Sequence, residues 1–152
     1  MKFQYKVIIM SVLCCLLIVF ISIQYISSDQ YKTTVVFKTK QGNVSIQCRN
    51  ADDDESRIRG LLDVTYLEQN KGMLFSYLSA EPKVFTMKGM KIPLDIIFID
   101  QNFTVMRVVE ADIGEEFIRS IYPVQFVVEI NQGFAKKNDI ETGSQVEIKN
   151  FT

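Results

Sequence analysis

The sequence predicts a β-rich α+β protein, in which an apolar N-terminal helix precedes one compact antiparallel β sandwich or partly open barrel with one or two short helices. Three observations support this prediction. Short stretches alternate apolar and polar side chains, as half-buried strands do. Turn-forming residues separate these stretches at hairpin spacing. A long apolar run occurs at the N-terminus, and the 152 residues suffice for a single domain.

Residues 1–28 combine a basic start with the apolar run. Lys2 and Lys6 come first, and residues 7–26 are then largely apolar, close to the roughly 20 residues that a helix needs to cross a bilayer. The run is longer than the core of most secretory signals, and no Ala-x-Ala cleavage site follows it. We therefore predict a single-pass membrane anchor with its N-terminus in the cytoplasm and the domain outside. A secreted or periplasmic protein, released by signal cleavage, is the alternative.

The composition excludes several classes of function. The chain contains no histidine, which removes the commonest general base and the usual zinc ligands. Residues 29–33 form a polar spacer, and the predicted domain, residues 34–152, is slightly acidic, which disfavours nucleic acid as a partner. Cys48 is the single cysteine of that domain, so no disulfide forms within it. No cofactor is predicted.

The first predicted elements are two strands joined by a turn, over residues 34–39 and 44–48. Cys48 lies on the apolar face of the second strand, which indicates a buried small side chain rather than a reactive thiol. Residues 50–55 are rich in acids. Hard oxygen ligands of this kind can bind a cation, but a helix capped by Asp52 or Asp53 is the better interpretation. Gly60 within that helix has no explanation from the sequence.

The rest of the domain is predicted to hold further strands, a loop with a helical turn over residues 111–122, and a short helix. The densest apolar run, residues 94–99, is expected to be a central strand because both of its faces are apolar. The other strands are predicted at residues 73–77, 103–109, 124–130 and 145–149, and the helix at 131–138.

Several short segments occur in a set order along the domain: Arg59-Gly60-Leu61-Leu62, Gly72-Met73-Leu74-Phe75, Phe85-Thr86-Met87-Lys88, Ile92-Pro93-Leu94-Asp95 and Glu129-Ile130-Asn131. As a set they resemble the domain of unknown function 192 family of bacteria and archaea. The resemblance covers about residues 44–148. It implies a compact β-rich domain, often behind an N-terminal signal or anchor, and it brings no established activity or catalytic residues.

Asp95 is the main candidate for chemistry. In strand geometry Leu94, Ile96 and Phe98 share one face, and Asp95 shares the other with apolar neighbours. A carboxylate there must be hydrogen-bonded or paired, or its pKa rises. Its predicted partners are backbone N–H groups, in a structural role, or the cations Arg57, Arg59, Lys88 and Lys91. Asp100, an odd number of residues away, projects to the opposite face, which counts against a paired-carboxylate glycosidase.

A second candidate is a soft metal site. Met73, Met87 and Met90, together with Cys48, are ligand types that suit cuprous copper. Methionines between apolar residues are more often core filling, and this interpretation is preferred.

Three hypotheses for function follow. The preferred one is a tethered binding or accessory module for a small molecule or an envelope protein. The alternative is an enzyme that uses Asp95 with a neighbouring cation as acid and base, which requires Asp95 to open onto a solvent-reachable cavity. Copper binding through the methionines and Cys48 is the third.

Overall fold

The chain divides between Gln30 and Tyr31 into two compact units. The computed structural model describes residues 2–151, and of residues 2–5, 7 and 23–29 it describes the backbone alone. Met1 and Thr152, the outer ends of the predicted segments 1–28 and 34–152, lie outside the described residues.

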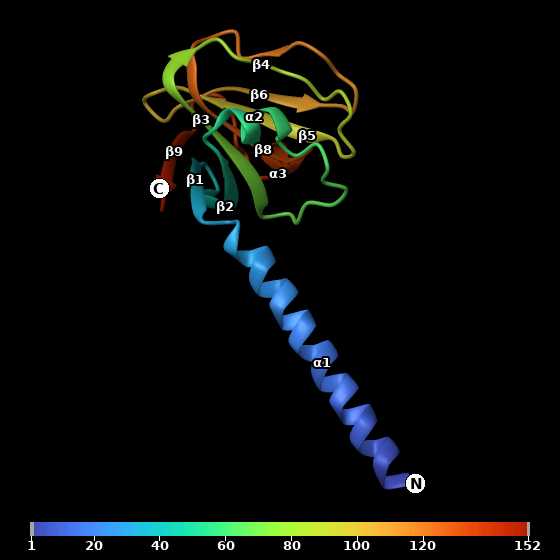
Figure 1. Ribbon diagram of the computed structural model, residues 1–152. Coiled ribbons are helices and arrows are strands. Elements are labelled where there is room, and N and C mark those ends of the chain that lie inside the picture. Colours follow the sequence, from blue (N-terminus) through green and yellow to red (C-terminus); the bar gives the residue numbers. More distant parts are fainter. Residues whose placement is uncertain (1, 152) are drawn as a thin grey trace. The chain divides into compact units, whose positions relative to one another are not determined.

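The first unit is helix α1, Lys2–Asp29 (Figure 1). Its described apolar side chains, from Ile8 to Ile21, are exposed. Within the part of the chain that the structure describes, no helix combines the length and the apolar character needed to cross a membrane. The anchor predicted over residues 7–26 therefore has no support from the structure, although several of its side chains lie outside the description. A location outside the cytoplasm stays a prediction from the sequence.

The second unit holds two β-sheets and two short helices (Figure 1). Helix α2 spans Asp54–Arg59, and helix α3 spans Phe134–Lys137. The strands described are β1 Thr33–Thr39, β2 Gly42–Ala51, β3 Lys71–Glu81, β4 Val84–Phe85, β5 Leu94–Ile99, β6 Val105–Ala111, β7 Ile118–Arg119, β8 Val124–Asn131 and β9 Gln145–Lys149. The large sheet has the order β6-β5-β8-β3-β2-β1-β9, and β4 pairs with β7 in a small sheet.

One pair of strands in the large sheet is parallel. Gln47 of β2 lies opposite Lys71 of β3, and Ala51 lies opposite Phe75, whereas the other neighbouring pairs are antiparallel. Parallel neighbours need a crossover connection, and α2 with the loop after it supplies one. The prediction of an antiparallel sheet is therefore wrong at this pair, because the sequence shows the helix but not which strand the chain joins afterwards.

The large sheet curls until its outer strands meet at one end. Thr104, just before β6, forms an isolated bridge with Gln145 of β9. Next to it the N–H of Val105 donates to the carbonyl oxygen of Ser144 at 2.9 Å. The β-rich class is confirmed, and the curled sheet corresponds to the partly open barrel among the predicted alternatives.

The concave face of the curled sheet encloses the first of two apolar clusters. It includes Cys48, fully buried as its strand pattern predicts, together with Ala135 of α3 and Ile140 just after it. As predicted, the apolar side chains of β5 point alternately to the two faces of the sheet, and Ile97 and Ile99 belong to this cluster. The domain is thus held together by ordinary burial.

The other face of the central strands is also buried. Leu94, Ile96 and Phe98 of β5 belong to this second cluster. The covering side chains come from the loop after α2 and from the segments around β4 and β7, and they are Leu61, Leu67, Met87, Met90 and Ile118. Strands β5, β8 and β3 therefore run through the middle of three layers, and any polar side chain on either face loses water.

The predicted elements are found with shifted ends. Residues 94–99 coincide with β5. Asp53 caps α2 by accepting the N–H of Ser56 at 2.8 Å, as the acid-rich run predicts. Residues 111–122 hold a turn and strand β7 rather than a helical turn. The pair of β4 and β7 was not predicted, since two-residue strands leave no periodic pattern.

Candidate functional site

The structure encloses Asp95 within the concave cluster. Its exposed fraction is 0%. One carboxylate oxygen, Oδ1, accepts the N–H of Gly133 at 3.0 Å, and Oδ2 accepts the N–H of Ala135 at 2.8 Å. Burial raises the pKa of Asp95, and the backbone hydrogen bonds partly offset that increase. Asp95 therefore fastens the start of α3 to the edge of the barrel interior.

A role as acid or base requires Asp95 to open onto a solvent-reachable cavity, and its placement in the structure argues against that role. Its carboxylate is bonded to backbone donors and is not among the side chains lining the cavity described below. Three of the four cations predicted as its partners line that cavity instead, where Arg57 pairs with Asp54 at 2.9 Å and Lys88 with Glu116 at 3.8 Å. The structural interpretation of Asp95 is favoured, and the enzyme hypothesis built on it is not.

The predicted copper ligands are divided between the two faces of the sheet. Cys48 lies in the concave cluster, whereas Met73, Met87 and Met90 lie in the second cluster. Burial raises the pKa of the Cys48 thiol, which keeps it protonated and unreactive. These four residues do not form one ligand set. Among the described residues no group of three or more histidine, cysteine, aspartate or glutamate side chains is placed to hold a metal ion.

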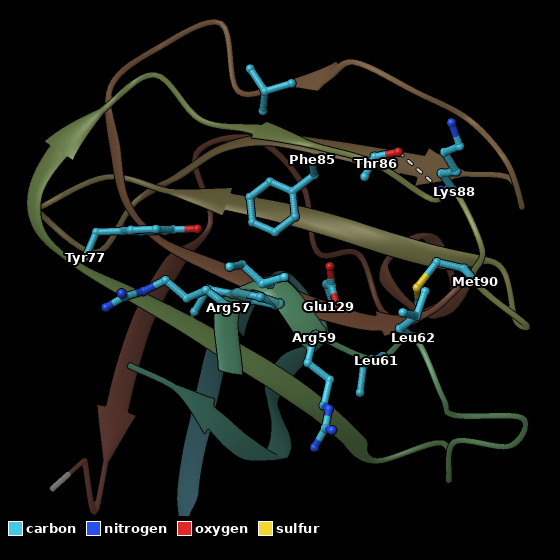
Figure 2. A pocket seen from close by; sticks show the side chains of 14 residues that line it. Arg57, Arg59, Leu61, Leu62, Tyr77, Phe85, Thr86, Lys88, Met90 and Glu129 are labelled. Carbon is cyan, nitrogen blue, oxygen red and sulfur yellow. Dashed lines mark hydrogen bonds between the residues drawn. The ribbon is translucent and has the colours of Figure 1, made fainter. Parts of the chain in front are cut away.

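The candidate site is a pocket on the convex face of the central strands, roofed by β4 and bordered by α2 (Figure 2). Its volume is about 380 Å³. Most of its walls are apolar or aromatic, and three of its lining residues are predicted binding residues: Arg57, Arg59 and Lys88. The remaining lining residues are Ile58, Gly60, Leu61, Leu62, Phe75, Tyr77, Val84, Phe85, Thr86, Met90 and Glu129.

Glu129 of β8 forms the polar floor of this pocket. Its exposed fraction is 6%, and its Oε2 atom has no hydrogen-bond partner among the described residues. Figure 2 shows its carboxyl group directed into the space below Phe85. Burial raises the pKa of Glu129 to about 8, so the group is mostly protonated at neutral pH. A buried polar atom without a partner costs free energy, which makes Glu129 the clearest functional candidate in the domain.

Glu129 was not predicted as a site residue. The alternation of residues 124–130 places it on the polar side of a half-buried strand, next to solvent. In the structure β8 lies between β5 and β3, opposite Ile96 on one side and Met73 on the other, so the face that carries Glu129 is covered. A signal was present, because Glu129 belongs to one of the segments that carry the family resemblance.

Gly60, unexplained by the sequence, lies beside Glu129. It ends α2 with φ at +50°, a conformation that side chains other than glycine rarely adopt. A Cβ atom at this position would lie 3.8 Å from Glu129 Oε2 and 3.5 Å from Cζ of Phe75. The glycine therefore serves the turn and keeps the wall of the pocket thin at this point.

Arg57 has a structural role at the border of the pocket. Its Nε donates to the carbonyl oxygen of Ser76 at 3.1 Å, and its remaining nitrogens bond Asp54 and the carbonyl oxygen of Asp52. Its guanidinium group also lies 5.2 Å from the ring centre of Tyr77. These contacts fasten α2 to β3, so Arg57 holds the border in place and has little bonding capacity left for a ligand.

The two other predicted cations lie at the mouth of the pocket. The side chains of Arg59 and Lys88 are exposed, and Figure 2 shows both charged groups directed away from Glu129. Tyr77 contributes a second polar group to the walls, and burial raises its pKa to about 12, which keeps its hydroxyl protonated. The structure thus brings three predicted residues to one pocket and leaves Asp95 outside it.

A family model described as uncharacterized ACR, domain of unknown function 192, matches residues 35–148. The chain belongs to the domain of unknown function 192 family. The resemblance inferred from the ordered segments is thereby confirmed, and the match includes the Glu129 pocket. No curated protein matches the chain.

Two solved structures are similar to this member of the domain of unknown function 192 family. One is a protein of unknown function from Novosphingobium aromaticivorans, 29% identical, with a TM-score of 0.72 over 75% of this chain and 83% of that one. The other is a protein from Sinorhizobium meliloti described as a candidate transcription regulator, 28% identical, with a TM-score of 0.74 over 80% of this chain and 98% of that one. Both support the fold of the globular unit.

The pocket has the features expected of a small-molecule site. Such sites are concave and mostly apolar, with a few polar groups that fix orientation. Here the polar groups include the carboxyl group of Glu129 at the floor and the hydroxyl of Tyr77 in the wall. Phe75 and Phe85 meet edge to face at 5.2 Å and form a rigid aromatic side to the space. The arrangement suits recognition of an apolar molecule that carries one polar group.

Proposed function

We propose that this domain is a binding module, and that the Glu129 pocket takes a small, mostly apolar molecule with a polar group at one end. The observation that carries the proposal is the buried Oε2 atom of Glu129, which faces the cavity and has no hydrogen-bond partner in the part of the chain that the structure describes. A ligand that hydrogen-bonds to this atom would remove its desolvation cost. The fold tolerates this desolvation cost because the unpaired oxygen atom serves to recognise the ligand.

The shape of the site supports a small molecule rather than a protein segment as the ligand. The volume, about 380 Å³, is in the range of known ligand pockets. The aromatic side of the pocket is held in place, since Phe85 contacts both Phe75 and Phe98, with ring centres 5.2 Å and 5.9 Å apart. A preformed pocket of this kind binds without a large ordering cost.

The proposal is tested by screening a fragment library against the full chain with ligand-observed NMR. Hits are then compared between the wild type and Leu62→Trp, which places an indole at the mouth of the pocket. Leu62 is 37% exposed, so the larger ring is expected not to prevent folding. We expect the variant to lose most hits or to weaken them at least about tenfold, because the ring excludes them sterically.

Leu78→Trp is the matched control, because Leu78 is fully exposed and does not line the pocket. Hits should be unchanged in this variant. A library that gives no hits, or hits that both tryptophan variants bind equally well, would contradict the proposal. The accessory role is a further proposal, and the location outside the cytoplasm is another that rests on residues 1–28; cell fractionation of the full chain tests the location.

A further inference from the structure

The chemistry around Glu129 indicates which kind of polar group the ligand carries, an inference that rests on the proposed binding function. Two kinds of group satisfy a buried glutamic acid. An ammonium group pairs with the ionised carboxylate, and an uncharged acceptor, such as an amide oxygen, accepts a hydrogen bond from the protonated acid. The two kinds of ligand group predict opposite dependences of binding affinity on pH.

The elements packed around Glu129 show which groups face it. From β3 come Phe75 and the protonated hydroxyl of Tyr77, and from β4 comes Phe85. The backbone of Gly60 approaches from the end of α2. On β5 the neighbour is Ile96, while Asp95 lies on the opposite face of the sheet.

Apart from Glu129, the charged side chains that line the pocket are Arg57, Arg59 and Lys88, and two of these cations pair with carboxylates, Arg57 with Asp54 and Lys88 with Glu116. Arg57 is bonded to Ser76, Asp54 and Asp52. Arg59 and Lys88 lie at the mouth and point outward (Figure 2). Burial is the cause of the raised pKa of Glu129, without an opposing contribution from these cations.

A cationic ligand would have to pass Arg59 at the mouth and then ionise the acid at the floor. Both steps are unfavourable, because like charges repel and a buried carboxylate loses its hydration. An uncharged acceptor needs neither step. It also fits the aromatic walls without burying a charge.

We propose that the ligand presents an uncharged hydrogen-bond acceptor to Glu129, and that Glu129 binds it as a neutral carboxylic acid through Oε2. The ligand class is an apolar molecule with an amide, ketone or similar oxygen at its inner end. Glu129 is then a specificity-determining residue, which rejects amines of the same size and shape.

Three probes of nearly equal shape test this proposal with the full chain: 2-phenylacetamide, 2-phenylethylamine and phenylacetate. Affinities are measured by NMR titration at pH 6.5 and pH 9.5. We expect 2-phenylacetamide to bind best at pH 6.5. Its affinity should fall about 30-fold at pH 9.5, because a group with a pKa near 8 keeps only about 3% of its protons there.

Two variants separate the hydrogen bond from packing. Glu129→Gln keeps an N–H donor without a titrating proton, so it should bind 2-phenylacetamide with an affinity that is nearly the same at both pH values. Glu129→Leu removes the donor and should lose at least about tenfold in affinity for the amide at pH 6.5. Melting curves of both variants establish that they are folded at each pH.

Preferential binding of 2-phenylethylamine, abolished by Glu129→Gln, would overturn the inference and leave the binding function intact. The same holds for phenylacetate, and for hits from the fragment library that bind in the pocket with no response to Glu129→Leu. If neither the three probes nor the library bind in the pocket, both the inference and the proposed function fail.

Discussion

Asp95 and Glu129 are two buried carboxyl groups on adjacent strands, and they differ in the hydrogen-bond partners that the fold supplies. They are near neighbours, since Asp95 lies opposite Ile130 and Glu129 lies opposite Ile96 in the pairing of β5 with β8. The one-residue offset places them on opposite faces of the sheet. Asp95 faces the concave cluster and binds two backbone N–H groups, whereas Glu129 faces the pocket with Oε2 unpartnered.

The comparison teaches that burial of a charge-bearing group does not by itself indicate a functional site. Asp95 has the smaller exposed fraction of the two, 0% against 6%, yet both of its carboxylate oxygens accept backbone N–H groups, so it stabilises the fold. Oε2 of Glu129 has no hydrogen-bond partner among the residues that the structure describes, and the side chain faces a cavity. The distinction lies in whether the protein itself satisfies the group.

The largest expected effect is the loss of stability when the carboxyl group of Asp95 is removed. Asp95→Ala should lower the free energy of unfolding by about 3–5 kcal/mol at pH 7, because two hydrogen bonds to the carboxyl group are lost and the N–H groups of Gly133, partly buried, and Ala135, buried, lose their partners. Urea denaturation of the full chain, followed by circular dichroism, measures this.

Asp100→Ala is the matched control. Asp100 also accepts two backbone N–H groups, those of Asn102 at 2.9 Å and Thr104 at 2.8 Å, but it is partly exposed. Water replaces the lost acceptor there, so the expected cost is only about 1 kcal/mol. Equal costs for the two variants would show that Asp95 does not have the structural role assigned to it.

The next largest effect concerns Glu129, whose replacement is expected to raise the free energy of unfolding rather than lower it. Its pKa is raised from an ordinary value of 4.5 to about 8, so the unfolded state binds fewer protons than the folded state between these values. The stability of the wild type should therefore fall as the pH rises from about 4.5 to 8 and then level off. Glu129→Gln removes this contribution and should be more stable than the wild type by about 2–3 kcal/mol at pH 7.

At pH 4.5 the two proteins should have nearly equal stability, which is the internal control for this measurement. Glu147→Gln on β9 is the control variant, since Glu147 is exposed and should change stability little at any pH. A Glu129→Gln variant less stable than the wild type across the whole pH range would mean that Glu129 is satisfied within the fold. The contrast with Asp95 would then disappear.

The smallest expected effects are those on stability and affinity when Gly60, in the wall of the pocket, is replaced. Gly60→Ala should cost about 1–2 kcal/mol in stability because its φ of +50° strains any side chain. Its methyl group would also narrow the space beside Glu129 and should weaken binding of 2-phenylacetamide at least about threefold.

Gly114→Ala is the control for Gly60→Ala, because Gly114 also has a positive φ, +85°, and open space around its Cβ position. It should show a similar loss of stability without loss of affinity. Equal affinity losses in the two variants would assign the effect to general destabilisation rather than to the pocket.

Much of the local structure could be predicted from the sequence. The alternating pattern gave the strands, with residues 94–99 in agreement with β5, and the acidic run gave the cap at Asp53. Asp100 lies in a turn as its position after β5 indicates. These features depend on neighbours within a few residues, which is the range over which side-chain periodicity and capping act.

The candidate site could be predicted only in part. Arg57, Arg59 and Lys88 were predicted as partners of Asp95, and in the structure they line the pocket of Glu129 instead. The error has one cause. The sequence shows that a strand has two faces, but it does not show which strands flank it or what covers each face.

The sequence by itself determined the strands of the large sheet, the two short helices, the two-sided apolar character of β5 and membership in a family. The tertiary structure decided the parallel pair of β2 and β3, the curl of the sheet and the chemical state of each buried acid. The physical reason is that desolvation and hydrogen bonding depend on contacts between distant segments. Asp95 is satisfied by residues 38 and 40 positions away, and Glu129 is enclosed by segments from α2 to β4.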